Sequence, residues 1–129
     1  VVINHSREDA VERGRALTGK RGCDLVVDYI GRDTWAKSLR IVRRGGRIVT
    51  CGATSGPNPE EDLRQVFYRQ IEILGCTMGN NKELADALKP VFDGRLKPVI
   101  DRVLPLSEVA EAHRLLETRQ VFGKIILKP

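Results

Sequence analysis

The sequence predicts an α/β fold in which a mostly parallel sheet is flanked by helices. Short β-branched runs alternate with segments of helical periodicity along the 129 residues, as parallel strands joined by crossover helices require. Three of the apolar runs also lead directly into glycine: Asp24–Gly31, Ile48–Gly52 and Ile71–Gly79. Because ligands of open parallel sheets bind beyond the carboxyl ends of the strands, where small residues leave the backbone accessible, these glycines indicate one shared ligand edge.

The chain opens with a predicted strand at Val1–Asn4, which is too short to stand alone. Ser6 is placed to cap the helix that follows, and the glycine-rich turn at Thr18–Gly22 ends that helix. A second strand is expected at Cys23–Ile30, where the near-continuous apolar run suits a parallel strand covered on at least one face.

The next helix is predicted to start after Gly31 and to bury three residues at helical spacing, namely Trp35, Leu39 and Val42. Gly45 and Gly46 are expected to end it by adopting positive φ. A buried strand follows at residues 46–51, and then a loop of small residues that ends at Gly56.

The rest of the chain repeats this alternation. We expect a helix at Asp62–Gln70, a strand at Ile71–Met78, a helix capped by Asn80 or Asn81, an extended segment at Val99–Leu104, a helix capped by Ser107 and a final strand at Ile125–Leu127. Pro90 is expected to kink or restart the third of these elements, and Asp93 with Gly94 to stop it.

Composition excludes several classes of protein. The 22 basic and 17 acidic residues give a net charge of +5, but opposite charges are interspersed and form no nucleic-acid stripe. No apolar run is long enough to cross a membrane. The three cysteines form no Cys-x-x-Cys pair, which predicts reduced thiols in the cytoplasm. His5 and His113 are the only histidines that could join them as ligands, so the sequence predicts no zinc site. The chain begins inside an apolar run without a methionine, so we expect a fragment.

The residues alone indicate no catalytic group. Asp28, Asp33 and Asp62 have no partner at the spacing of an acid–base pair, and His113 lies in an amphipathic helix. His5 is expected in an exposed turn, with the wall of an adenine pocket as the alternative. Neither a Gly-x-Gly-x-x-Gly fingerprint nor a Walker sequence is present. What remains is an α/β ligand-binding domain.

An ordered set of short motifs narrows this reading: Leu17–Gly19, Asp24–Asp28, Gly45–Val49, Cys51–Gly56, Ile73–Gly79, Leu96–Asp101, Ala110–Arg114 and Phe122–Leu127. In this order and spacing they resemble the C-terminal half of the medium-chain dehydrogenase/reductase superfamily, and most of all its zinc-type alcohol dehydrogenases and quinone oxidoreductases. The resemblance implies a partial Rossmann domain at residues 1–97 and a return to the family's catalytic domain at 98–129. It also implies hydride transfer between NAD or NADP and an alcohol, aldehyde, ketone or quinone.

Carried over by position, the resemblance places residues from several strand ends at the nicotinamide cofactor. Those expected to contact it are Ile30, Gly31, Cys51, Gly52, Ala53, Thr54, Met78, Gly79, Asn80 and Lys124, the last as a positive charge near the phosphates. In the family the glycine-rich phosphate turn, the residue that selects NAD over NADP and every zinc ligand lie upstream. The resemblance therefore implies that this fragment is inactive by itself, although its parent protein could hold zinc.

The resemblance also has consequences for assembly. A Rossmann sheet has the strand order 3-2-1-4-5-6, and by resemblance the chain retains only strands 3, 4, 5 and 6. We therefore expect Val1–Asn4 to move beside Cys23–Ile30, to fray, or to pair with another molecule. Relatives often pair the strand equivalent to Ile71–Met78 across a twofold axis, which implies a homodimer.

Two other functions remain open at this stage. One is a non-catalytic nucleotide-binding or regulatory module built on the same sheet. The other is a methyltransferase-like or flavodoxin-like domain, which would need an acidic residue or a phosphate loop after the first strand. Asn4–Ser6 supplies neither of these.

Overall fold

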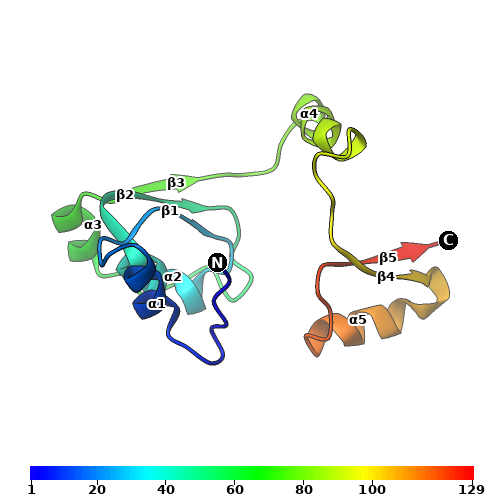
Figure 1. The fold of residues 1–129 in the computed structure, drawn as a ribbon, viewed down its shortest axis with the longest axis horizontal. Coiled ribbons are helices and arrows are strands. Elements are labelled where there is room, and N and C mark those ends of the chain that lie inside the picture. The colour runs from blue at the N-terminus through cyan, green and yellow to red at the C-terminus, as the bar shows by residue number, and fades with distance from the viewer. The chain divides into compact units, whose positions relative to one another are not determined.

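A computed structural model describes residues 1–129 and divides them into two compact units, Val1–Met78 (unit 1) and Gly79–Pro129 (unit 2). Each unit has its own sheet (Figure 1). None of the helices combines the length and the apolar character that crossing a membrane requires. The domain boundary expected from the resemblance, between residues 97 and 98, separates a Rossmann domain from a catalytic domain. The two compact units do not test it, and it stays a prediction.

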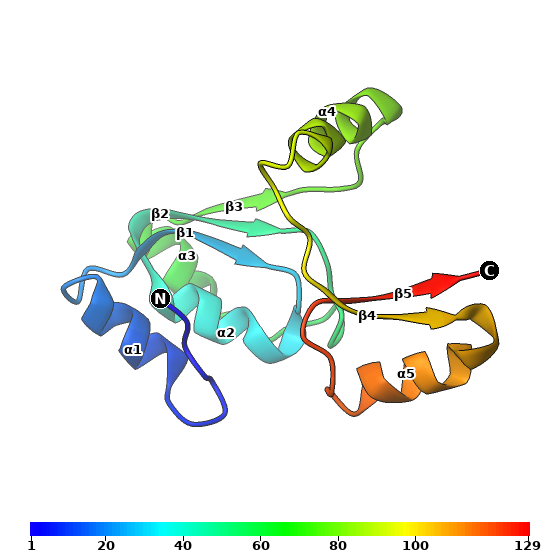
Figure 2. The same ribbon diagram turned by 45° about the vertical axis from the view of Figure 1, so that its right-hand side comes forward.

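Unit 1 is a three-stranded parallel sheet with helices on one face. Its elements in chain order are α1 (Ala10–Leu17), β1 (Cys23–Asp28), α2 (Arg32–Ile41), β2 (Val42–Thr50), α3 (Leu63–Arg69) and β3 (Glu72–Gly75). The strands lie in the order β1-β2-β3, and all three helices lie on the same side of them (Figures 1 and 2). The predicted α/β class with a parallel sheet is confirmed.

The core of unit 1 forms between the sheet and α2. Its five buried members are Trp35, Leu39, Val42, Ile48 and Ile71. The helical spacing predicted the first three correctly, because they share one face of α2 and the residue after it. On the opposite face of the sheet Leu25, Val27 and Leu74 are exposed, so β1 is covered on one face only.

The predicted strand at Val1–Asn4 is wrong. This segment joins no sheet, and the Asn4 carbonyl instead accepts hydrogen bonds from the N–H groups of Arg7 and Glu8. Its relocation beside β1 is also wrong, since β1 has only β2 as a neighbour. Asp9 rather than Ser6 caps α1, because its Oδ1 accepts from two N–H groups of the first turn, at 2.7 and 3.0 Å.

The glycine pair does not end a helix. α2 already stops at Ile41, and Gly45 and Gly46 lie inside β2. There the register with β1 slips: Cys23 faces Val42, but Leu25 faces Arg47. Gly45 has φ of 62°, which is the left-handed conformation that such an irregularity needs.

Unit 2 contains α4 (Asn81–Phe92), β4 (Ile100–Pro105), the 3₁₀ turn η1 (Leu106–Glu108), α5 (Val109–Glu117) and β5 (Lys124–Lys128), with β4 and β5 parallel. Asn80 caps α4 as predicted, in a reciprocal pair with Glu83. The helix runs through Pro90 to Phe92 without restarting. The predicted cap at Ser107 is wrong, because that residue lies within η1 and α5 has no side-chain cap.

Candidate functional site

The carboxyl ends of β2 and β3 form an open groove of about 500 Å³. Its walls are short side chains and backbone, contributed by Thr50, Cys51, Gly52, Ala53, Gly75, Cys76 and Thr77. At Gly75 a Cβ atom would point into open space, with no atom within 4 Å. A flat ring could therefore approach the backbone of β3 at this point.

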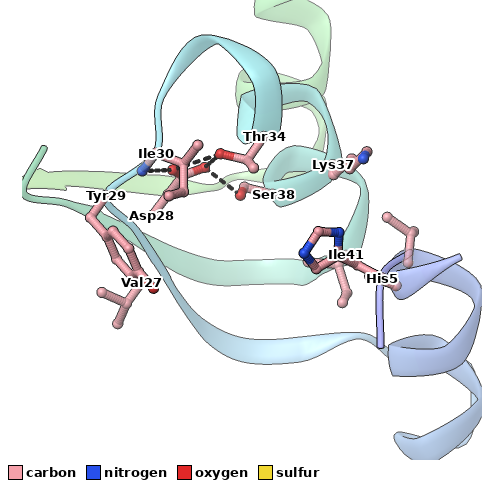
Figure 3. Close-up of a pocket in the computed structure, with 11 residues that line it drawn as sticks. His5, Val27, Asp28, Tyr29, Ile30, Thr34, Lys37, Ser38 and Ile41 are labelled. Atoms are coloured by element: carbon pink, nitrogen blue, oxygen red, sulfur yellow. Dashed lines mark hydrogen bonds between the residues drawn. The ribbon is translucent and has the colours of Figure 1, made fainter. Parts of the chain in front are cut away.

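The turn after β1 is organised by the buried carboxylate of Asp28. Its oxygens accept hydrogen bonds from the Ile30 N–H and from the hydroxyls of Thr34 and Ser38 (Figure 3). The Gly31 N–H is the fourth donor. Burial raises the pKa of Asp28, but these four donors outweigh burial, so its pKa lies below the ordinary value. Asp28 is therefore an ionised positioning group, and it fixes where the turn and the start of α2 lie.

The small-residue loop after β2 is joined to this turn. The Ser55 hydroxyl donates to the Ile30 carbonyl at 2.8 Å and accepts from the Asp33 N–H at 3.0 Å. Gly31, with φ of 90°, bridges to Gly56, and a Cβ atom there would lie only 2.7 Å from the Gly56 carbonyl oxygen. The ends of β1 and β2 are thus held at fixed positions relative to each other.

Of the residues predicted from the sequence, Cys51, Gly52 and Ala53 come together in the groove. Thr54 lies beyond them, and its hydroxyl donates to the Tyr29 carbonyl at 3.1 Å. Gly31 is buried in the turn and does not line the groove.

The remaining predicted residues lie elsewhere in the chain. Met78 is 92% exposed at the end of unit 1. Asn80 and Lys124 belong to unit 2 with Gly79. There the Asn80 side chain accepts from the Glu83 N–H at 3.0 Å, and Lys124 opens β5 opposite Ile100. Their contacts with a cofactor stay predictions.

Sequence reasoning missed four polar residues that shape these strand ends: Asp28, Thr34, Ser38 and Ser55. The one available signal was an aspartate at the end of an apolar strand, three residues before a glycine. A carboxylate in that position can accept from the N–H groups of a tight turn. Gly75, Cys76 and Thr77 lay inside the predicted strand, and the structure adds them to the groove.

A second cavity of about 410 Å³ lies along β1, between α1 and α2. Ile30, His5 and Ile41 are among its wall residues, and Figure 3 labels all three. Aliphatic side chains share the remaining wall with the polar groups of the Asp28 cluster, and Lys37 is the one basic side chain besides His5. His5 thus lines a cavity while remaining exposed.

The residues present do not fit a zinc ion. No three His, Cys, Asp or Glu side chains lie close enough together to hold a metal, and zinc sites in proteins use at least three such ligands. The groove is lined by two glycines and short side chains, which leave room for a planar ring at the strand ends.

Comparison with known proteins supplies the wider context. A family model described as zinc-binding dehydrogenase matches residues 1–127. A 2-haloacrylate reductase of Burkholderia sp is 36% identical over 98% of this chain and 41% of its own length. For quinone oxidoreductase 1 of Escherichia coli K12 the identity is 32%, over 99% of this chain and 42% of the relative.

Solved structures agree with these matches. The crystal structure of an NAD-dependent alcohol dehydrogenase superposes with a TM-score of 0.86 and 43% identity, over 98% of this chain and 37% of that protein. A 2-octenoyl-CoA carboxylase reductase in complex with NADP and 2-octenoyl-CoA gives a TM-score of 0.82 and 30% identity, over 98% and 32%. The chain therefore spans less than half the length of these relatives.

Proposed function

The chain belongs to the zinc-binding dehydrogenase family of the medium-chain dehydrogenase/reductase superfamily, and we propose that it is the cofactor-binding C-terminal portion of an NAD(P)-dependent oxidoreductase. The observation that carries this proposal is the open groove at the ends of β2 and β3, with its accessible backbone. Relatives described as NAD-dependent and as NADP complexes support the choice of cofactor.

In the proposed complex the nicotinamide, when bound, supplies hydride chemistry. The residues of this chain bind and orient it: Cys51–Thr54 and Met78–Asn80 flank the ring and its ribose, and Ile30 with Gly31 lies beside the cofactor. Lys124 offers a positive charge to the phosphates. Asp28 acts as a positioning residue, because its hydrogen bonds fix the turn that carries Ile30 and Gly31.

The substrate in this proposal is a small molecule that accepts or donates hydride. An alcohol, aldehyde, ketone or quinone fits the alcohol dehydrogenases and quinone oxidoreductases among the relatives. The 2-haloacrylate and crotonyl-CoA reductases add acids and thioesters with a conjugated double bond. No step is assigned to zinc, because this chain offers no ligand set for it.

We further propose that the protein is cytoplasmic and forms a homodimer, and that this chain has no activity by itself. Three free thiols suit the reducing cytoplasm. The outer edge of β3 is unpaired, which suits a homodimer formed through Ile71–Met78. The chain by itself should bind cofactor without turnover. In that respect it would behave like the non-catalytic nucleotide-binding module that is the alternative function.

The test is a titration of the purified chain with NADH and NADPH, following nicotinamide emission and the fluorescence of Trp35, its single tryptophan. We expect saturable binding that Gly75→Leu weakens by at least about tenfold, because a leucine would occupy the groove. Gly75→Ala is the matched control and should bind within about threefold of the natural chain, since its Cβ meets no neighbour.

Two results would speak against the proposal. Equal binding by both variants would show that the cofactor lies outside the groove. Absence of saturable binding at millimolar cofactor would show that these strand ends form no site of their own.

A further inference from the structure

Two exposed cysteines occupy equivalent positions at the ends of neighbouring strands. The register of β2 and β3 places Thr50 opposite Gly75, and Cys51 and Cys76 are the next residues of the two strands. Both side chains are free thiols, and both residues line the groove.

Backbone hydrogen bonds hold both residues at the end of the sheet. The Cys76 N–H donates to the Thr50 carbonyl at 2.9 Å, which is the last hydrogen bond of the β2–β3 ladder and fixes the backbone at Cys76. The Cys51 N–H donates to the Asp28 carbonyl at 3.3 Å, which holds the end of β2 against β1. Neither cysteine therefore belongs to a free loop.

This arrangement suits a covalent link between the two thiols. Neighbouring strands lie about 4.8 Å apart, and disulfides join residues whose Cα atoms are about 4.4–6.8 Å apart. Residues in register on parallel strands also direct their side chains to the same face. We propose that Cys51 and Cys76 form a dithiol modification site, which a hydroperoxide converts into an intramolecular disulfide across the groove.

The chemistry balances with hydrogen peroxide as the oxidant. The thiolate of one cysteine attacks a peroxide oxygen and becomes a sulfenic acid, and the peroxide O–O bond breaks to release water once a proton is taken up. The second thiol then attacks the sulfenic sulfur, an S–S bond forms and a second water leaves. In total, two thiols and one H₂O₂ give one disulfide and two H₂O.

The remaining cysteine is an internal control. Cys23 is partly buried and begins β1, whereas Cys51 and Cys76 follow the ends of their strands. It has no cysteine opposite it, because its partner in β2 is Val42. A dimer formed along the outer edge of β3 would leave the site open, since the Cys76 N–H faces β2 and the groove lies between the two strands.

The experiment treats the purified chain with stoichiometric H₂O₂, traps the remaining thiols with N-ethylmaleimide and digests with trypsin without a reductant. The three cysteines fall in separate tryptic peptides, residues 22–32, 48–64 and 70–82. We expect free thiols to fall from the three present in the sequence to one, with peptide 48–64 linked to peptide 70–82. In a parallel sample, dithiothreitol added before N-ethylmaleimide should restore all three.

Variants and isotopes make the result decisive. Cys23→Ser should form the link as the natural chain does, whereas Cys51→Ser and Cys76→Ser should lose it. A mixture of ¹⁴N and ¹⁵N chains should give no mixed-isotope linked peptide. A link through peptide 22–32, a mixed-isotope link, or irreversible oxidation of both thiols without a link would each overturn the proposal. Since the readout needs no nicotinamide, failure of the proposed function would leave this result unaffected.

Discussion

At the scale of single residues, Asp28 organises the turn after β1. Its carboxylate is buried, and all of its hydrogen-bond donors lie within ten residues of it along the chain. An amide at this position would turn an NH₂ group toward donors, so Asp28→Asn should leave part of the cluster unsatisfied. We expect it to lower the free energy of unfolding at pH 7 by roughly 1–3 kcal/mol in urea titrations.

The pH dependence of this loss has a definite sign. Because the pKa of Asp28 is lowered by folding, its contribution is fully present above the ordinary pKa of aspartate and disappears as pH falls through the lower folded value. The gap between the natural chain and Asp28→Asn should therefore narrow below about pH 4. Asp33→Asn is the matched control. Its carboxylate is exposed and should change stability by less than about 0.5 kcal/mol.

Two glycines of unit 1 should respond in opposite directions to the same substitution. Gly31 has φ of 90°, and a Cβ atom there would clash with the Gly56 carbonyl. Gly75 has open space instead. We expect Gly31→Ala to lower the free energy of unfolding by more than about 1 kcal/mol, and Gly75→Ala to raise it by up to about 1 kcal/mol, in parallel urea titrations. Equal effects would contradict the assigned conformation at Gly31.

Between elements, Arg69 joins α3 to the end of α2. Its guanidinium donates to the carbonyls of Leu39 and Val42. Leu39 lies in the last turn of α2, where no further helical turn can bind its carbonyl, and Val42 is the first residue of β2. Arg69→Met should keep the aliphatic stem and leave these carbonyls unpaired, at a cost of roughly 1–3 kcal/mol in thermal or urea unfolding. Arg40→Met, an exposed position on α2, should change stability by less than about 0.5 kcal/mol. Similar losses of stability in Arg69→Met and Arg40→Met would show that removing a positive charge, and not the hydrogen bonds of Arg69, causes the loss.

The sequence predicts an element well when residue spacing or a capping residue within the element defines it. It predicts poorly an element that forms only by pairing with a distant part of the chain. The spacing alone predicts a buried helical face at Trp35, Leu39 and Val42. The residue type at Asn80 likewise predicts a helix cap. Val1–Asn4 has the composition of a strand, but a strand exists only when a neighbour accepts its hydrogen bonds.

The candidate site follows the same division. Strand-end glycines predicted the groove at Cys51–Ala53, since a small residue after an apolar run is a local signal. The Asp28 cluster depends on how the turn brings Ser38, ten residues away, back to the strand. The glycine pair was misassigned because its positive φ belongs to a slip in pairing with β1, which only the sheet reveals.

Over the whole of unit 1, the sheet presents two kinds of surface that favour association. Its helix-free face carries exposed Leu25, Val27 and Leu74, whereas parallel sheets normally have both faces covered. The outer edges of β1 and β3 also carry unpaired backbone groups. A dimer could form through the helix-free face or through the outer edge of β3. Single substitutions on one surface or the other can distinguish these two interfaces.

We expect the chain to form a dimer through the edge of β3. The Cys76 N–H faces β2, so by alternation the Gly75 N–H faces outward, and proline is tolerated at such an edge position. Gly75→Pro should weaken the dimer by at least about tenfold in sedimentation velocity, because it removes an outward donor and adds a ring at the edge. Val27→Lys changes the bare face and should leave the dimer intact. The reverse outcome, a monomeric Val27→Lys and a dimeric Gly75→Pro, would assign association to the apolar face and remove the support for pairing through Ile71–Met78.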